Sequence, residues 1–131
     1  KKSKFGRIIN IISTSVKIPI NGLGVSNTIR GAVANWSKTL ANEVGKYNIT
    51  VNNILPGFTN TPRLSSLVEN MSKKQKKPVT EIKKNIINSV PLQRLGTVED
   101  IAYITSFLAS PKASYISGTN IPVDGGRTGS L

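Results

Sequence analysis

A run of β-branched residues near the start of the chain constrains its fold more than any other feature. Residues 6–12 read Gly-Arg-Ile-Ile-Asn-Ile-Ile, and the polar residues Ser13, Thr14 and Ser15 follow them. A continuous apolar run of this length is typical of a strand that is buried on both faces of a parallel sheet. We therefore expect residues 6–12 to form a central strand of such a sheet.

The next two segments complete a strand–helix–strand unit. After a loop marked by Pro19, Gly22 and Gly24, apolar residues recur at helical spacing and predict an amphipathic helix that ends near Gly45: Ile29, Val33, Trp36, Leu40 and Val44. Residues 48–55 predict a second strand, which Pro56-Gly57 ends. A strand, a helix and a strand in this order form the crossover unit of parallel sheets.

The rest of the chain continues the alternation. Residues 61–89 are polar and lysine-rich with an interruption at Pro78, which predicts two short helices joined by a mobile segment. Residues 97–100 resemble a capping box and begin a helix that should end before Pro111, and residues 116–126 predict a last short strand and a glycine turn. Three strands and about four helices predict the α/β class.

A sheet of only three parallel strands would leave an edge exposed, so we expect it to have neighbours. The chain also opens with Lys-Lys-Ser-Lys and without an initiator methionine. Both observations lead us to expect that the chain is part of a longer protein.

The composition excludes several kinds of chemistry. The chain of 131 residues has no cysteine and no histidine, which removes disulfides, a thiolate nucleophile and the usual zinc ligands, so we expect no metal site. No apolar run approaches the roughly 20 residues of a membrane span, so we expect a cytoplasmic protein without a membrane partner.

The net charge of +12 would suit a polyanionic partner. However, six of the lysines lie in a polar stretch without aromatic residues that could stack on bases: Lys73, Lys74, Lys76, Lys77, Lys83 and Lys84. We favour a solvated face of a lid over a nucleic-acid surface, and expect no nucleic acid as a partner.

Five blocks in order give the chain a resemblance to a known family. They are Gly6–Ile11 leading to Ser13, residues 48–57, Pro-Leu-Gln-Arg-Leu-Gly at 91–96, Phe-Leu-Ala-Ser at 107–110, and Ser-Gly at 117–118 through Val-Asp-Gly-Gly at 123–126. The chain resembles the short-chain dehydrogenase/reductase family, particularly its acyl-carrier-protein ketoacyl reductases. The resemblance implies that residues 1–131 are a partial domain: the C-terminal half of a Rossmann-type doubly wound parallel sheet, without the dinucleotide-binding N-terminal half.

The resemblance also assigns the catalytic positions. Ser13 matches the family's serine, which hydrogen-bonds the substrate carbonyl, while Ser26 and Arg30 occupy the positions of its tyrosine and lysine. No Tyr-x-x-x-Lys occurs in the chain. A serine hydroxyl is much less acidic than a tyrosine hydroxyl, and arginine is a poor proton relay, so proton transfer would differ from the family's.

Ordinary structural roles would also explain these residues. Ser13 could be a strand-end serine that bonds the backbone, and Ser26 could cap a helix with a solvated Arg30 one turn on. At the second strand end, the resemblance implies that Pro56, Gly57, Thr59 and Thr61 lie near NAD or NADP. Turn geometry alone would also account for Pro56-Gly57.

Two function classes remain for the full-length protein. The first is an NAD(P)-dependent oxidoreductase that acts on a small carbonyl or alcohol substrate, possibly linked to a carrier that the basic lid attracts; the 131 residues alone should be inactive. The second is a non-catalytic family member that acts as a binding or assembly subunit. In both, the resemblance implies a homodimer or homotetramer that uses the helix of residues 27–44 and the last strand.

Overall fold

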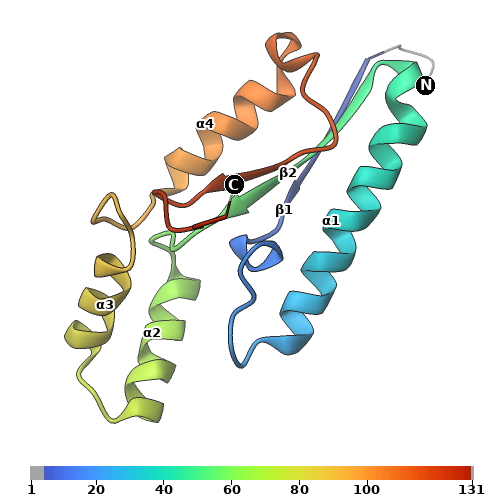
Figure 1. Cartoon of the computed structure of the whole chain (residues 1–131). Helices are drawn as coiled ribbons and strands as arrows, with labels where there is room; N and C mark the ends of the chain where they lie inside the picture. Colours follow the sequence, from blue (N-terminus) through green and yellow to red (C-terminus); the bar gives the residue numbers. More distant parts are fainter. Residues whose placement is uncertain (1–4, 131) are drawn as a thin grey trace.

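The computed structural model describes residues 5–130 as a parallel sheet with helices on both of its faces (Figure 1). The strands lie in the order β1–β2–β3. In chain order the elements are β1 (Gly6–Ile11), η1 (Thr14–Val16), α1 (Gly24–Val44), η2 (Gly45–Tyr47), β2 (Ile49–Pro56), α2 (Pro62–Gln75), α3 (Val79–Asn88), α4 (Val98–Ala109), η3 (Pro111–Ala113) and β3 (Asn120–Val123). This confirms the predicted α/β class with three strands and four α-helices.

The central strand β2 carries the core of the sheet. Its neighbouring residues Ile54 and Leu55 are both fully buried, and because side chains alternate along a strand they point to opposite faces. Leu55 packs with Ala34 of α1, while Ile54 packs with Leu108 of α4. Complete burial of such a side chain contributes about 1.5–3 kcal/mol, so β2 holds the two helical layers together.

The strand β1 differs from the prediction that it is central. It pairs only with β2, from Gly6 opposite Ile49 to Ile11 opposite Ile54, and therefore forms an edge of the sheet within the described residues. Its residues are mostly half-buried, and Ile11 is 50% exposed. The strand that is buried on both faces is instead β2, because α1 packs on one face and α4 on the other.

The helix α1 is confirmed, but its apolar stripe is divided between the core and the surface. The residues that α1 buries are Ala34, Ser37 and Ala41, whose small side chains let the helix lie close to the sheet. Ile29 and Trp36 belong to the predicted stripe and are 59% and 52% exposed. Periodicity located the helix correctly but did not identify the face that packs on the sheet.

A buried polar network joins α1 to all three strands. The Asn53 side chain lies at its centre and is 2% exposed. Its Oδ1 accepts hydrogen bonds from Asn10 Nδ2 at 3.0 Å and from Ser37 Oγ at 2.8 Å. Its Nδ2 donates to Asn120 Oδ1 at 2.7 Å. Asn53 therefore connects β1, α1, β2 and β3 at a single point.

The lysine-rich segment forms the two predicted helices. They lie side by side beyond the carboxyl ends of the strands and share a core of Leu64, Val68, Ile82 and Ile86 (Figure 1). The six lysines are exposed, as expected of a solvated face. In α4 the capping box is confirmed, with Thr97 and Asp100 each bonding the other's backbone. Over residues 5–130, no helix is long and apolar enough to cross a membrane.

Candidate functional site

A cavity of about 440 Å³ lies where β1 and β2 end and where α1 and α2 begin. Its lining includes all seven residues predicted for the site: Ser13, Ser26, Arg30, Pro56, Gly57, Thr59 and Thr61. The carboxyl ends of parallel strands are the usual place for ligands in open α/β sheets. The seven predicted residues, which lie up to 48 positions apart in the sequence, thus meet in one cavity.

Ser13 follows β1 and caps the short helix η1. Its Oγ accepts a hydrogen bond from the backbone N–H of Ser15 at 3.0 Å, so the local structural role predicted as an alternative is present. That bond uses a lone pair of the hydroxyl oxygen and leaves its hydrogen free. Among the described residues Ser13 Oγ donates to no acceptor, and the hydroxyl can therefore donate to a ligand.

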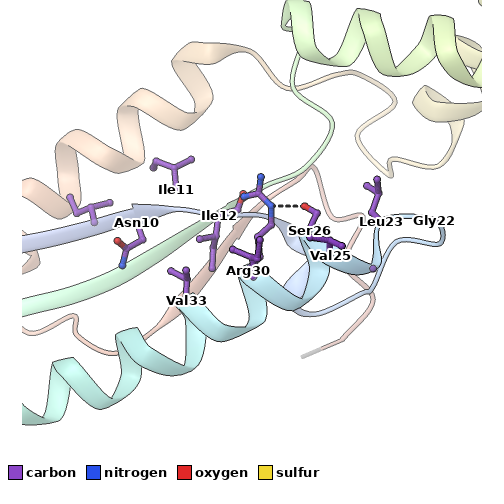
Figure 2. A pocket seen from close by; sticks show the side chains of 12 residues that line it. Asn10, Ile11, Ile12, Gly22, Leu23, Val25, Ser26, Arg30 and Val33 are labelled. Atoms are coloured by element: carbon purple, nitrogen blue, oxygen red, sulfur yellow. Dashed lines mark hydrogen bonds between the residues drawn. The ribbon is translucent and has the colours of Figure 1, made fainter.

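Ser26 and Arg30 face one another across one turn of α1 (Figure 2). Arg30 Nε donates to Ser26 Oγ at 3.2 Å, and Arg30 NH1 donates to the Ile12 carbonyl at 2.6 Å. Ser26 lies within the first turn and is not the N-cap, which is Leu23. The alternative of a capping serine with a solvated arginine is therefore wrong, because the guanidinium is anchored at the end of β1. Its remaining N–H groups have no partner within residues 5–130.

A second and more open cavity, of about 860 Å³, adjoins the first one. It follows the groove between the edge of β1 and the N-terminal half of α1, and it includes Asn10, Ile11 and Val33 (Figure 2). Ser26 and Arg30 line both cavities. The pair therefore stands at the junction between the strand ends and the open edge of the sheet.

Gly57 is required by the approach of β2 to β3. Its N–H continues the ladder by donating to the Val123 carbonyl at 3.0 Å. A Cβ at this position would lie 2.6 Å from the Cβ and 2.8 Å from the Cα of Asp124, closer than such atoms can pack. The structure thus gives Gly57 a packing role, which differs from the predicted alternative of turn geometry, in addition to its place on the cavity wall.

Thr59 and Thr61 shape the start of α2. Thr61 is the N-cap: its Oγ1 accepts from the Leu64 N–H at 3.4 Å, and Pro62 begins the helix. Thr59 forms an isolated parallel bridge with Gly96, in which the Phe58 carbonyl and the Asn60 N–H make the bonds. The Thr59 N–H has no partner among the described residues and is free to donate to a ligand.

Among the other residues of the cavity wall, Phe58, Arg63 and Arg127 had no role assigned to them from the sequence. The Arg127 guanidinium lies over the Phe58 ring, 4.5 Å from its centroid. Asp124 shapes the turn that carries Arg127 by accepting from the N–H groups of Gly126 and Thr128. Burial raises the pKa of Asp124, but these bonds, led by the one from Thr128, outweigh burial and hold its pKa below the ordinary value. No local motif indicates Arg127, since its partner Phe58 is distant in sequence.

Known proteins match this chain along nearly its whole length. The family model described as Enoyl-(Acyl carrier protein) reductase matches residues 1–128. The NADPH-dependent reductase BacG of Bacillus subtilis (strain 168) is 37% identical over 131 residues, which are 100% of this chain and 51% of that protein. The 3-oxoacyl-[acyl-carrier-protein] reductase FabG of Haemophilus influenzae is 39% identical over 125 residues, 95% of this chain and 47% of that protein. The chain thus spans about half the length of these curated relatives.

Solved structures agree with this relationship. The crystal structure of YwfH, an NADPH-dependent reductase involved in bacilysin biosynthesis, has a TM-score of 0.93 at 37% identity and covers 99% of this chain and 50% of that chain. The 3-ketoacyl-(acyl-carrier-protein) reductase from Brucella melitensis, complexed with NADH, has a TM-score of 0.80 at 31% identity. The match covers 97% of this chain and 46% of that chain. Given these matches, the chain belongs to the short-chain dehydrogenase/reductase family and resembles its 3-oxoacyl-acyl-carrier-protein reductases.

Proposed function

We propose that this chain is the substrate-side half of an NAD(P)-dependent oxidoreductase that transfers a hydride between nicotinamide and a carbonyl or alcohol. The single observation that carries the proposal is the cavity at the strand ends, which holds all seven predicted residues. The dinucleotide-binding half comes from another part of the full-length protein, and residues 1–131 alone are inactive. The substrate is a small carbonyl or alcohol compound, free or carrier-linked, since relatives include carrier-protein reductases.

The residues at the end of β2 fit a nicotinamide cofactor. The free N–H of Thr59 suits the carboxamide oxygen, and the wall formed by Pro56 and Gly57 would lie beside the ring. The first turn of α2 contains no acidic residue and follows the Thr61 cap, so its positive end suits a phosphate group. When bound, the cofactor supplies or accepts the hydride.

The residues at the end of β1 serve the substrate carbonyl. The free hydroxyl hydrogen of Ser13 donates to the carbonyl oxygen and orients it. Arg30 places a positive charge beside the carbonyl oxygen and is held there by its hydrogen bond to the Ile12 carbonyl. Because arginine keeps its proton, Arg30 stabilises negative charge on the oxygen but does not relay a proton.

In the reduction direction, the proton that the substrate carbonyl oxygen takes up comes by way of Ser26. Its Oγ accepts from Arg30 Nε, and its own O–H donates to no acceptor among the described residues. A water molecule bound to this hydroxyl would give a proton to the substrate oxygen and regain one from solvent, so that no hydroxide is left in the site. Without the tyrosine of the family, this step is slow, since a positioned general acid typically contributes about 10²–10⁴ in rate.

The test combines cofactor binding with restoration of the family's residues. Calorimetry on the full-length protein should show binding of NADH or NADPH, and Ser26→Tyr with Arg30→Lys should raise kcat by at least about tenfold. Ser66→Tyr, on the exposed surface of α2, is the control and should leave kcat unchanged. Absence of binding to both cofactors would refute the proposal.

One observation favours a second function as an assembly subunit. Val25, Ile29 and Trp36 form an exposed apolar stripe on α1, with Val25 77% exposed. Such a stripe on a helix suits contact with another copy, which would give a homodimer or homotetramer. A protein that assembles in sedimentation experiments but binds neither cofactor would support this function over the first.

A further inference from the structure

Within residues 5–130, three arginine side chains and no acidic residue line the cavity at the strand ends. They are Arg30, Arg63 and Arg127. The two ion pairs found over residues 5–130 lie elsewhere, between Lys77 and Glu81 and between Arg94 and Asp100. The positive charge that converges on this cavity is therefore not neutralised by a carboxylate of the described chain.

Two helix ends add to the positive potential of the cavity. Leu23 and Ser26 from the start of α1 line it, as do Thr61 and Arg63 from the start of α2. Neither helix has an acidic residue in its first turn, and α1 and α2 are 21 and 14 residues long. Helix N-termini favour anions, so the backbone and the arginines act in the same direction.

Of the three arginines, Arg127 has the guanidinium that is best oriented to bind a ligand. Its guanidinium lies over the Phe58 ring, which restricts its plane, and the Asp124 turn holds its backbone. No side-chain hydrogen bond of Arg127 or Arg63 occurs within the described residues. A planar guanidinium with free N–H groups matches the two oxygens of a carboxylate or a phosphate. Arg30, by contrast, uses part of its donor set on Ser26 and Ile12.

We propose that the substrate of this site carries an anionic group, a carboxylate or phosphate oxygens, which Arg127 binds with help from Arg63. The carbonyl to be reduced lies at Ser13, on the part of the wall that follows β1. This inference rests on the proposed function for the identity of the reacting group, but the binding of the anion does not depend on turnover. Ser13 and Arg127 line the same cavity, and its volume of about 440 Å³ is typical of a small-molecule site.

The experiment compares ligands with and without the anionic group. Calorimetry on the full-length protein measures binding of acetoacetate and of its uncharged methyl ester, and the same pair is offered as substrates with NADH or NADPH. We expect the acid to bind at least about tenfold more tightly than the ester, as for hydrogen bonds to charged groups. A second pair, acetoacetyl-coenzyme A and acetoacetyl-pantetheine, distinguishes a phosphate source from a carboxylate.

Variants assign the preference to the arginines. Arg127→Gln should reduce the preference for the charged ligand to about twofold or less, and Arg127→Lys should retain part of it because the charge remains. Lys74→Gln is the matched control: it removes one positive charge from the same helix as Arg63, at an exposed position outside the cavity, and should leave the preference intact. Thermal melts of the variants confirm that each remains folded.

The outcomes separate this inference from the proposed function. Preference for the anion without hydride transfer would keep the inference and refute the oxidoreductase. Equal binding of both members of each ligand pair would refute the inference, even with active turnover. A loss of NADPH affinity in Arg127→Gln with unchanged preference for the charged ligand would also refute it, because the arginine would then serve the cofactor.

Discussion

Replacement of Asn53 by alanine should destabilise the protein more than any exposed asparagine change. The side chain is 2% exposed and makes three hydrogen bonds, to Asn10, Ser37 and Asn120. Each such bond contributes about 1 kcal/mol net, and a buried partner left without a bond costs about 1–3 kcal/mol. Without Asn53, the single hydroxyl hydrogen of Ser37 turns to the Val33 carbonyl, and Asn10 keeps its bond to Ser37. The expected loss is therefore about 3 kcal/mol.

Urea denaturation of the full-length protein, followed by circular dichroism, measures this loss as a lower free energy of unfolding. The matched control is Asn42→Ala, on the exposed face of α1, which should change stability by less than about 0.5 kcal/mol. If the free energy of unfolding of Asn53→Ala lies within about 0.5 kcal/mol of that of the unmodified protein, the network does not hold α1 and the strands together.

Two further predictions concern the elements around the cavity. The Arg94 side chain and then the Thr97 N–H hold the pKa of Asp100 at about 2, below its ordinary value of 3.8, so its stabilisation is complete above 3.8 and lost as the pH falls through 2. Asp100→Asn should therefore lower the urea midpoint at pH 7 and leave it unchanged once the pH is well below 2; equal midpoints at pH 7 would contradict this. Gly57→Ala should cost about 1–3 kcal/mol because of the contact with Asp124. Gly31→Ala, in open space on α1, should stabilise by about 0.5–1 kcal/mol, and similar melting temperatures for both variants would refute the packing argument.

The sequence could predict which residues at two strand ends and in one helix turn belong to the site. Their resemblance to family motifs placed Ser13, Arg30 and Thr61 near one another, and the structure finds them on one cavity wall. The sequence could not predict which hydrogen bonds each of these side chains makes. The bond from Arg30 to the Ile12 carbonyl and the free hydrogen of Ser13 depend on how α1 sits over the end of β1. Arg127 could not be predicted because its contact with Phe58 depends on the pairing of the last strand with the sheet.

The sequence by itself determined the order and type of the elements. Apolar spacing, the stop at Pro56-Gly57 and the capping box of Thr97 and Asp100 act between residues a few positions apart, so they can be read before folding. Only the tertiary structure decided that β2 is central, that α1 buries Ala34 and Ser37 while Trp36 is exposed, and that three arginines share one cavity. These features depend on which strand pairs with which, as in the contact of Asn10 with Asn53, and a local pattern carries no information about partners 43 residues away.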